Sequence, residues 1–472
     1  MSRVRGSADV GRPVRVGAPD ASLTAVSGLA AVTELVARLG VVAAFDGHVD
    51  AIKQRARGLS AGEFLVMLAS EQLLGEDVFA GFDRLRDDAG GSLLGPAALP
   101  AATTAGALAR RFGPQHLRGV EAAVAEVTAR WLARLPAQRR MELVLRGPTI
   151  DMDSTEVEVY GHNKDGVAYN YAGQLAGRPH LASWAEAGLP LAADLLAGNE
   201  DVRPRAADLL RRALAGLPGQ VCGKPRVRAD AGYFTAELAH AAVEADADFA
   251  IAAKRNPVMW RAYAAVPESA WVRARDMPGA QVTAVDYAPE GWPPGSYAII
   301  RRVRVDVADV SADPRSRRRR TIPKDQLTLA LDGDLDHVWA VSFIVTNIPA
   351  DDGAPIAAIE AWFRRRTDIE EKIRKAKLGA GLCHLPSADR GVNTVWMWGA
   401  LLAGLISVML QSLAGLDTRD RGRARHPRLR HELLCVPARL IRHARTLTLR
   451  LPPGRQLLPE VLARLRELPL PA

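Results

Sequence analysis

The chain has 472 residues, more than one compact core usually contains, so we expect two to four units of domain size. Its 48% hydrophobic and 24% charged residues are typical of a soluble protein, and its net charge of +9 favours a polyanionic partner over an acidic small substrate, although an arginine-rich, merely solvated surface would give the same total. The three cysteines form no C-x-x-C pair, which argues against a disulfide framework or a thiolate zinc site and fits a reducing cytoplasm.

Residues 1–20 are polar and rich in glycine and proline, and we expect a disordered tail there, with no apolar run that could serve as a signal peptide. Residues 21–147 show a helical pattern, because apolar side chains recur at steps of three and four from Leu29 to Leu39. Near its end, two predicted helices are joined by a short turn at Gly113, with Arg110 and Arg111 at the elbow. This pattern predicts either a DNA-binding helix-turn-helix or a plain helical hairpin.

The pattern changes to α/β after residue 147. Strands are predicted at 149–160, 168–175, 180–196, 226–229 and 249–253, with helices at 205–217 and 235–245. Three strands followed by helix, strand, helix and strand indicate a sheet with mixed strand direction. We take residues 148–255 as the first part of a core.

Residues 256–337 interrupt this pattern with prolines, glycines and the basic run Arg315–Arg320, and we expect a β-rich insertion. The core resumes over 338–415 with a strand at 338–346 and a helix from about residue 354 to 378. The most apolar stretch, Val395–Leu410, has 16 residues, fewer than the ~20 that span a bilayer, so we expect a buried core helix and no membrane contact.

The C-terminal region, residues 416–472, is basic. Between positions 417 and 450 it contains ten arginines and three acidic residues. Such a cluster is typical of a surface that neutralises phosphates, and a solvated loop is the alternative. The chain ends in a predicted amphipathic helix at 458–468.

One predicted helix has an unusual face. At about 100° per residue, Phe363, Glu370 and Lys377 all lie within about 60° of Arg366. This face presents a guanidinium, a carboxylate and an ammonium group in succession. Such an order suits an enzyme that holds a metal ion with the carboxylate and binds phosphates with the flanking cations.

Two further acids are candidates for the same site. Asp230 directly follows a predicted strand, and Asp153 lies on a strand whose alternation places Asp151 on the same face. Three carboxylates around an open site suit Mg²⁺ or Mn²⁺, and two such ions would support phosphoryl transfer. Each acid also has an ordinary interpretation: a surface strand residue, a turn-forming aspartate, or an ion pair between Glu370 and Arg366.

Together these residues resemble a known family. Phe363, Arg366, Glu370 and Lys377 match the spacing of the Y-R-E-K signature of bacterial insertion-sequence DDE transposases with a group 1 DDE domain, with phenylalanine in place of tyrosine. Asp153-Ser154-Thr155 resembles the family's first Asp-x-Thr stretch, and Asp230 precedes a helix after a short strand, as the second acid does. The segments 162–180 and 381–398 are also similar to such transposases.

The resemblance implies an RNase H-like catalytic core interrupted by a β-rich insertion, with a helical N-terminal DNA-binding region. It implies metal-dependent strand cleavage and strand transfer at terminal inverted repeats, with Asp153, Asp230 and Glu370 as catalytic metal ligands and Asp151 as a further metal candidate. We expect two Mg²⁺ or Mn²⁺ ions, double-stranded terminal and target DNA as partners, and a homodimer on DNA in the cytoplasm, associated with the nucleoid. The residues expected to contact DNA are Phe363, Arg366, Lys377, Arg110, Arg111, Arg317, Arg318, Arg319, Arg320, Arg423 and Arg425.

Two other functions fit the same sequence features. A metal-dependent DNA nuclease on the same fold would cut without strand transfer, and a catalytically inactive protein would only bind DNA. An RNA-binding protein fits less well, because aromatic residues make up only 5% of the chain.

Overall fold

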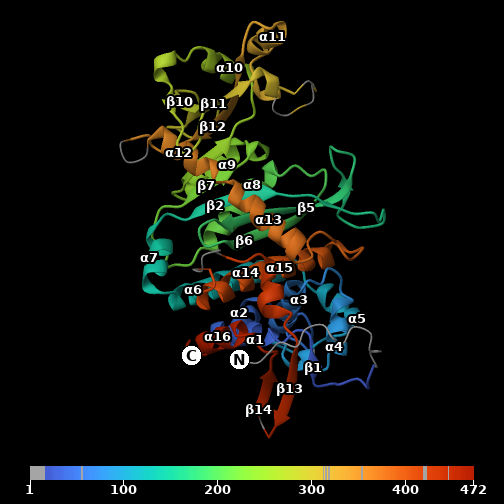
Figure 1. Cartoon of the computed structure of the whole chain (residues 1–472). Helices are drawn as coiled ribbons and strands as arrows, with labels where there is room; N and C mark the ends of the chain where they lie inside the picture. The colour runs from blue at the N-terminus through green and yellow to red at the C-terminus, as the bar shows by residue number, and fades with distance from the viewer. Residues whose placement is uncertain are drawn as a thin grey trace, which may run out of the picture.

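The computed structural model describes residues 16–54, 57–311, 313, 316, 319–351, 355–417, 423–444 and 446–471. Figure 1 shows an elongated molecule in which helices from both ends of the chain lie at one end, a mixed sheet crosses the middle, and the segment carrying α10, β10 and α11 projects at the other end.

We call the first part the helical module. Its helices are α1 (Leu29–Leu39), α2 (Val41–His48), α3 (Ala61–Leu74), α4 (Gly81–Asp87), η1 (Gly91–Leu93), α5 (Ala102–Ala109) and α6 (Pro114–Arg134), followed by α7 (Ala137–Leu145). The C-terminal elements α15 (His426–Leu429), η6 (Arg430–Leu434) and α16 (Leu457–Arg466) join it, and β1 (Leu23–Thr24), β13 (Ala438–His443) and β14 (Thr446–Arg450) form a small antiparallel sheet. The two ends of the chain therefore build one module.

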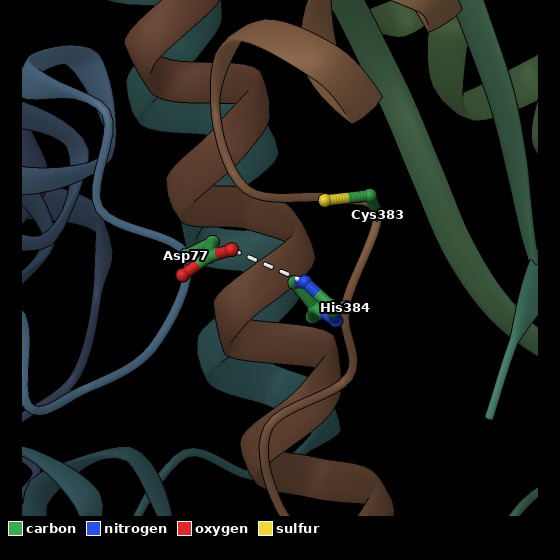
Figure 2. A group of neighbouring side chains, drawn as sticks. All are labelled: Asp77, Cys383 and His384. Carbon is green, nitrogen blue, oxygen red and sulfur yellow. Dashed lines mark ion pairs between the residues drawn. The ribbon is translucent and has the colours of Figure 1, made fainter. Parts of the chain in front are cut away.

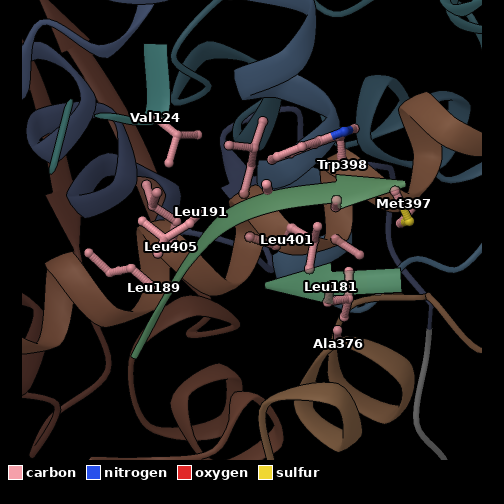
Figure 3. Close-up of a cluster of buried hydrophobic side chains, with 14 of the residues drawn as sticks. Val124, Leu181, Leu189, Leu191, Ala376, Met397, Trp398, Leu401 and Leu405 are labelled. Atoms are coloured by element: carbon pink, nitrogen blue, oxygen red, sulfur yellow. The ribbon is translucent and has the colours of Figure 1, made fainter. Parts of the chain in front are cut away.

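The module is organised around α14 (Arg390–Leu413), the apolar helix expected from the sequence. Within the described residues it is the one helix long and apolar enough to cross a membrane, but 94% of its most apolar stretch is buried inside the protein. It packs against α3 on one side and the sheet on the other. Figure 3 shows side chains that meet there: Val124, Leu181, Leu189, Leu191, Ala376, Met397, Trp398, Leu401 and Leu405.

The central sheet contains the strands β2 (Thr149–Ser154), β5 (Leu175–Trp184), β6 (Leu189–Ala197), β7 (Arg226–Ala229) and β8 (Asp248–Ala252), with the short β3 (Val157–Glu158) and β4 (Ala168–Tyr169) at its margin. The order β6-β5-β2-β7-β8 is 3-2-1-4-5 along the chain, with β2, β7 and β8 parallel and β5 antiparallel to both its neighbours. Helix α8 (Arg203–Ala215) connects β6 to β7, and η2 (Ala231–Tyr233) with α9 (Ala236–Glu244) connects β7 to β8. This topology is the RNase H-like mixed sheet that was expected.

The strand expected over 180–196 is in fact two. Residues 175–197 form the β5–β6 hairpin, whose turn uses Gly188 at a φ of +78°, a conformation that favours glycine. The apolar residues on both arms read as one run in the sequence, because both strands are buried and neither alternates clearly with polar residues.

The insertion contains β9 (Val272–Arg273), β10 (Ala280–Val285) and β11 (Tyr297–Asp306), together with α10 (Pro257–Ala264), η3 (Glu268–Ala270), η4 (Val307–Asp309), η5 (Arg319–Thr321) and α11 (Lys324–Asp332). Its strands do not form a separate sheet. Strand β12 (His337–Thr346) pairs with β11 along its whole length and with β8 at its last three residues, so core and insertion share one sheet of eleven strands.

The helix expected at 354–378 is divided. The structure has α12 (Ile356–Arg364) and α13 (Thr367–Gly379), separated by two residues whose amides bond three positions back: Arg365 N–H to Trp362 O at 3.2 Å and Arg366 N–H to Phe363 O at 2.9 Å. This tighter turn changes the helix direction between them. The prediction of one continuous helix face from Phe363 to Lys377 is therefore wrong at its N-terminal end, because Phe363 lies on α12 and Lys377 on α13.

The candidate helix-turn-helix, α5 and α6, is built into the module. Helix α6 packs against α2 and against β6 of the central sheet, and its buried residues continue from His116 to Leu132. Arg110 and Arg111 at the elbow are exposed. The described contacts leave α6 little free surface to enter a DNA groove, whereas the elbow arginines face solvent.

A buried acid in α3, Glu71, allows the packing of the helical module to be tested. Glu71 is fully buried, and a Cβ placed on Gly81 would approach its Oε1 atom to 2.0 Å. Burial raises the pKa of Glu71 from 4.5 to about 9, and the nearby Glu76 adds to the rise. The folded protein therefore holds a proton that the unfolded chain loses above pH 4.5, so this residue lowers stability as pH rises towards 9.

We predict that Glu71→Gln raises the stability of the helical module at pH 7 by about 3 kcal/mol, because glutamine needs no proton in the buried position. Thermal melting between pH 4 and 9 measures it. The Tm difference from the parent should vanish near pH 4 and grow with pH. Glu244→Gln on exposed α9, whose side chain is 63% accessible, is the control and should change little. A pH-independent difference for Glu71→Gln would contradict the prediction.

Candidate active site

The pairing of β2 with β7 brings two candidate acids together. These strands run parallel with Met152 opposite Ala229, so the next residues along each strand are Asp153 and Asp230. Their spacing in the sequence, 77 positions (230 − 153), equals the register offset of the pair. Neighbouring parallel strands lie about 4.8 Å apart, and their carboxyl ends form the usual ligand site of such sheets.

The third acid comes from α13, which crosses the sheet in front of β2 (Figure 1). Arg366, directly before α13, donates from Nη1 to Asp153 Oδ2 at 3.2 Å and lies with Nη2 3.5 Å from Glu370 Oε1. One guanidinium therefore bridges an acid of the sheet and an acid of the helix. The ion pair of Arg366 with Glu370, the ordinary interpretation of this spacing, exists, but it belongs to a cluster that includes Asp153.

The pKa of Asp153 reflects the charges of its neighbours Arg366, Asp230 and Glu370. Burial raises its pKa to about 6, Arg366 opposes the rise, and the carboxylates of Asp230 and Glu370 add to it. Its side chain is 14% exposed, whereas that of Glu370 is 57% exposed. Below these groups, the buried Tyr233 has a pKa well above its usual value, because of burial and of the charges on Asp153 and Asp230.

The donor set fits a hard divalent cation, because it offers carboxylate oxygens from three elements around a partly open site. In this arrangement the oxygens of Asp153, Asp230 and Glu370 do not all lie within 4.8 Å of one another. The guanidinium of Arg366 sits between two of them and supplies the positive charge that a metal ion would supply.

Asp151, the further metal candidate, pairs with an arginine and does not join the three acids. It is fully buried, and both its oxygens accept hydrogen bonds from Arg228, at 2.7 Å from Nε and 2.9 Å from Nη2. Arg228 also donates to the carbonyl of Trp362 at the end of α12, and its guanidinium lies 5.2 Å from the centre of that indole ring. Asp151 therefore has its oxygens engaged in a structural ion pair.

Phe363 and Lys377 do not both face the acids. Phe363 packs beside an apolar cluster formed by Ala250, Ile299, Ile344, Ile348 and Ile359, because the break before α13 turns it away. Lys377 remains on the side of the site: its Nζ donates to Glu156 O at 2.7 Å, which holds the turn after β2. The part of the predicted face that survives is Arg366, Glu370 and Lys377.

The other predicted DNA contacts are scattered. Arg317 and Arg318 lie outside the described residues, and Arg319 and Arg320 begin η5 in the insertion, far along the sheet from α13. Arg425 forms an ion pair with Glu371 at 2.8 Å, and Arg423 is largely buried, 3.9 Å from Asp417. Of the described residues in this set, Arg423 pairs with Asp417 and Arg425 with Glu371, and neither forms an ion pair with the three acids.

Two residues near the site were not singled out from the sequence. Arg228 could have been found, because its offset from Asp151 is the same 77 positions (228 − 151) that relates the two candidate aspartates, Asp153 and Asp230. Lys372 of α13 donates to Ser183 Oγ at 3.2 Å and Trp184 O at 3.1 Å, and burial lowers its pKa to about 8. No spacing pattern distinguishes such a buried lysine from a solvated one.

The topology and the acids at the carboxyl ends of β2 and β7 define an RNase H-like α/β protein with an acidic site. The chain matches the family described as transposase DDE domain group 1 over residues 7–470, so it belongs to this family of DDE transposases. No curated protein matches it. Among solved structures, it is similar to a piggyBac transposase synaptic complex with hairpin DNA, at 9% identity over 85% of this chain and 78% of that chain, with a TM-score of 0.35.

The different surroundings of the two aspartates on β2 lead to a prediction. Asp151→Asn leaves the Arg228 charge buried with a neutral partner and should lower the unfolding free energy by about 3 kcal/mol. Asp153→Asn removes a carboxylate that burial already disfavours and should change it by less than about 1 kcal/mol. Urea and thermal unfolding of both variants measure the difference, and equal losses would contradict the assignment of Asp151 to a structural pair.

Proposed function

We propose that this protein is a DNA transposase that cuts DNA at its terminal repeats and transfers the freed strand to a target, using divalent ions held by Asp153, Asp230 and Glu370. The observation that supports this proposal is that Arg366 contacts both Asp153 and Glu370, while the register of β2 and β7 sets Asp230 beside Asp153. The alternatives are a nuclease that uses the same site without strand transfer and an inactive DNA-binding protein.

The acids would bind Mg²⁺ or Mn²⁺, and a pair of such ions activates the attacking oxygen and stabilises the leaving oxygen of an in-line displacement. Water would first open a phosphodiester at the repeat, which leaves a 3′-hydroxyl. That hydroxyl would then attack a phosphodiester of the target, so that one P–O bond forms for each one broken.

The residues around the acids have separate tasks in this proposal. Arg366 would exchange its carboxylate partners for phosphate oxygens, which suit the bidentate geometry of its guanidinium. Lys377 holds the turn after β2 and so keeps the end of that strand, and with it Asp153, in place. The Asp151–Arg228 pair connects the sheet to the end of α12 and so positions the start of α13.

The surface contacts to DNA would be electrostatic. Arg110, Arg111 and Arg425 are exposed and could each neutralise a phosphate, so affinity would fall steeply with salt. A dimer is the simplest assembly that brings two terminal repeats to one target. The protein would then act in the cytoplasm, on the nucleoid.

The proposal predicts that Asp153→Asn, Asp230→Asn and Glu370→Gln each lower Mg²⁺-dependent strand cleavage by at least about 100-fold, because each removes a metal ligand. DNA binding, measured by gel shift, should remain. Glu371→Gln is the matched control, since Glu371 pairs with Arg425 and lies on another side of the helix. Undiminished cleavage by any of the three variants would remove that residue from the site.

The products separate the alternatives. A labelled terminal-repeat duplex with a supercoiled target should give strand-transfer products joined through the 3′-hydroxyl. Cleaved ends without joined products would support the nuclease, and binding without cleavage in the parent protein would support the inactive DNA-binding protein.

A second prediction concerns Arg366. In the absence of DNA, its guanidinium competes with a metal ion for Asp153 and Glu370, so Arg366→Gln should bind Mn²⁺ more tightly, by about 1 kcal/mol or fivefold. Cleavage should nevertheless fall at least about tenfold, because the bidentate phosphate contact is lost.

Isothermal titration with Mn²⁺ and the cleavage assay measure the two effects on the same preparation. Arg374→Gln is the control. Arg374 lies on α13, and the acid with which it pairs is Glu371, at 3.6 Å, which is not one of the three candidate metal ligands. Weaker Mn²⁺ binding by Arg366→Gln would show that the guanidinium does not compete with the ion.

A further inference from the structure

A second group of potential metal ligands lies away from the three acids. Figure 2 shows Asp77, Cys383 and His384 gathered from two segments that are 306 positions apart (383 − 77). Their ligand atoms all lie within 4.8 Å of one another, the one such group of three His, Cys, Asp or Glu residues within the described part of the chain. His384 Nε2 is 3.1 Å from Asp77 Oδ2.

The two segments that carry these ligands are held against each other. Asp77 lies between α3 and α4, and the other two residues follow α13. Gly381 adopts a φ of +72°, and a Cβ there would come within 2.8 Å of Glu76 O and 3.0 Å of Asp77 Cα. Only a glycine permits this approach, so the loops meet backbone to backbone.

Further bonds fix the same junction. Trp396 Nε1 donates to Gly381 O at 3.0 Å, and Cys383 N–H donates to Lys377 O at 3.2 Å. Arg430 joins the C-terminal ends of α3 and α13, because it donates from Nε to Leu73 O at 2.7 Å and from Nη2 to Gly379 O. The ligands therefore sit on fixed backbone, which is what a preorganised metal site requires.

The donor set of one sulfur, one imidazole nitrogen and one carboxylate oxygen selects a borderline ion such as Zn²⁺ over Mg²⁺, which prefers oxygen. Around tetrahedral Zn²⁺ such atoms lie about 3.3–3.6 Å apart. The His384–Asp77 contact is close to that spacing already, and rotation of the Cys383 side chain would bring in the thiolate. The Asp77 and His384 side chains are 46% and 55% exposed, so an ion and a fourth, water ligand can reach the site.

We propose that Asp77, Cys383 and His384 bind one Zn²⁺ ion that fastens the α3–α4 loop of the helical module to the segment leaving α13. This proposal departs from the sequence expectation against a thiolate zinc site. The absence of a C-x-x-C pair excludes the common spacing but not a single thiolate that tertiary packing places beside a histidine and a carboxylate. The site is independent of the proposed catalytic site and has a different ligand chemistry.

Titration of the full-length protein with Co²⁺ tests the proposal, because a thiolate ligand gives a charge-transfer absorption that carboxylate sites lack. The protein should carry Asp153→Asn and Asp230→Asn, so that the catalytic site does not compete for the ion. We expect a thiolate–Co²⁺ band that saturates at one equivalent and is displaced by Zn²⁺. Cys383→Ser should abolish the band, and Asp77→Asn and His384→Ala should each weaken binding at least about tenfold.

Cys222→Ser is the matched control, since Cys222 is a free thiol elsewhere on the surface, and it should retain the band. Zn²⁺ should also raise the Tm of the parent but not that of Cys383→Ser, while the two proteins melt alike in chelator, which shows that the variant folds. No saturable band, a band that survives Cys383→Ser, or unchanged binding in Asp77→Asn or His384→Ala would overturn the proposal.

Discussion

The buried ion pair between Arg228 and Asp151 is the interaction on which the rest of the site depends. Arg228 lies on β7, binds both oxygens of Asp151 on β2, and reaches the last turn of α12 through the Trp362 carbonyl and ring. A buried charge without a partner is costly, so β2 and β7 cannot slip past each other without a large loss of stability. The same register sets Asp153 beside Asp230, and the bond to α12 sets where α13 begins.

The negative charge of the three acids is only partly offset by a neighbouring cation. Burial is the main cause of the raised pKa of Asp153, and the nearby charges of Asp230 and Glu370 raise that pKa further. The guanidinium of Arg366 compensates part of this rise.

The parts outside the core are attached to it firmly. The insertion continues the sheet through β12, and its own packing centres on Arg302, whose guanidinium lies 4.2 Å from the ring of Trp271 and 4.3 Å from that of Trp339. The helical module is joined through α14, which is buried between α3 and the sheet. Both attachments rest on extensive contacts with the sheet, so the insertion and the helical module are held in fixed positions relative to α13.

The sequence by itself predicted three candidate acids for one site and much of the secondary structure, because spacing and periodicity are local properties. Asp153, Asp230 and Glu370 were found from spacing and motif, and α14 from its apolar run. Tertiary packing decided the rest. The break before α13 lies where Arg228 holds the Trp362 carbonyl. Phe363 packs into an apolar cluster to which three other segments contribute, and Asp151 pairs with Arg228 on the neighbouring strand. Asp77 meets Cys383 and His384 because Gly381 lets its loop approach the backbone of the α3–α4 loop, and no pattern along a chain records which distant segments will come into contact.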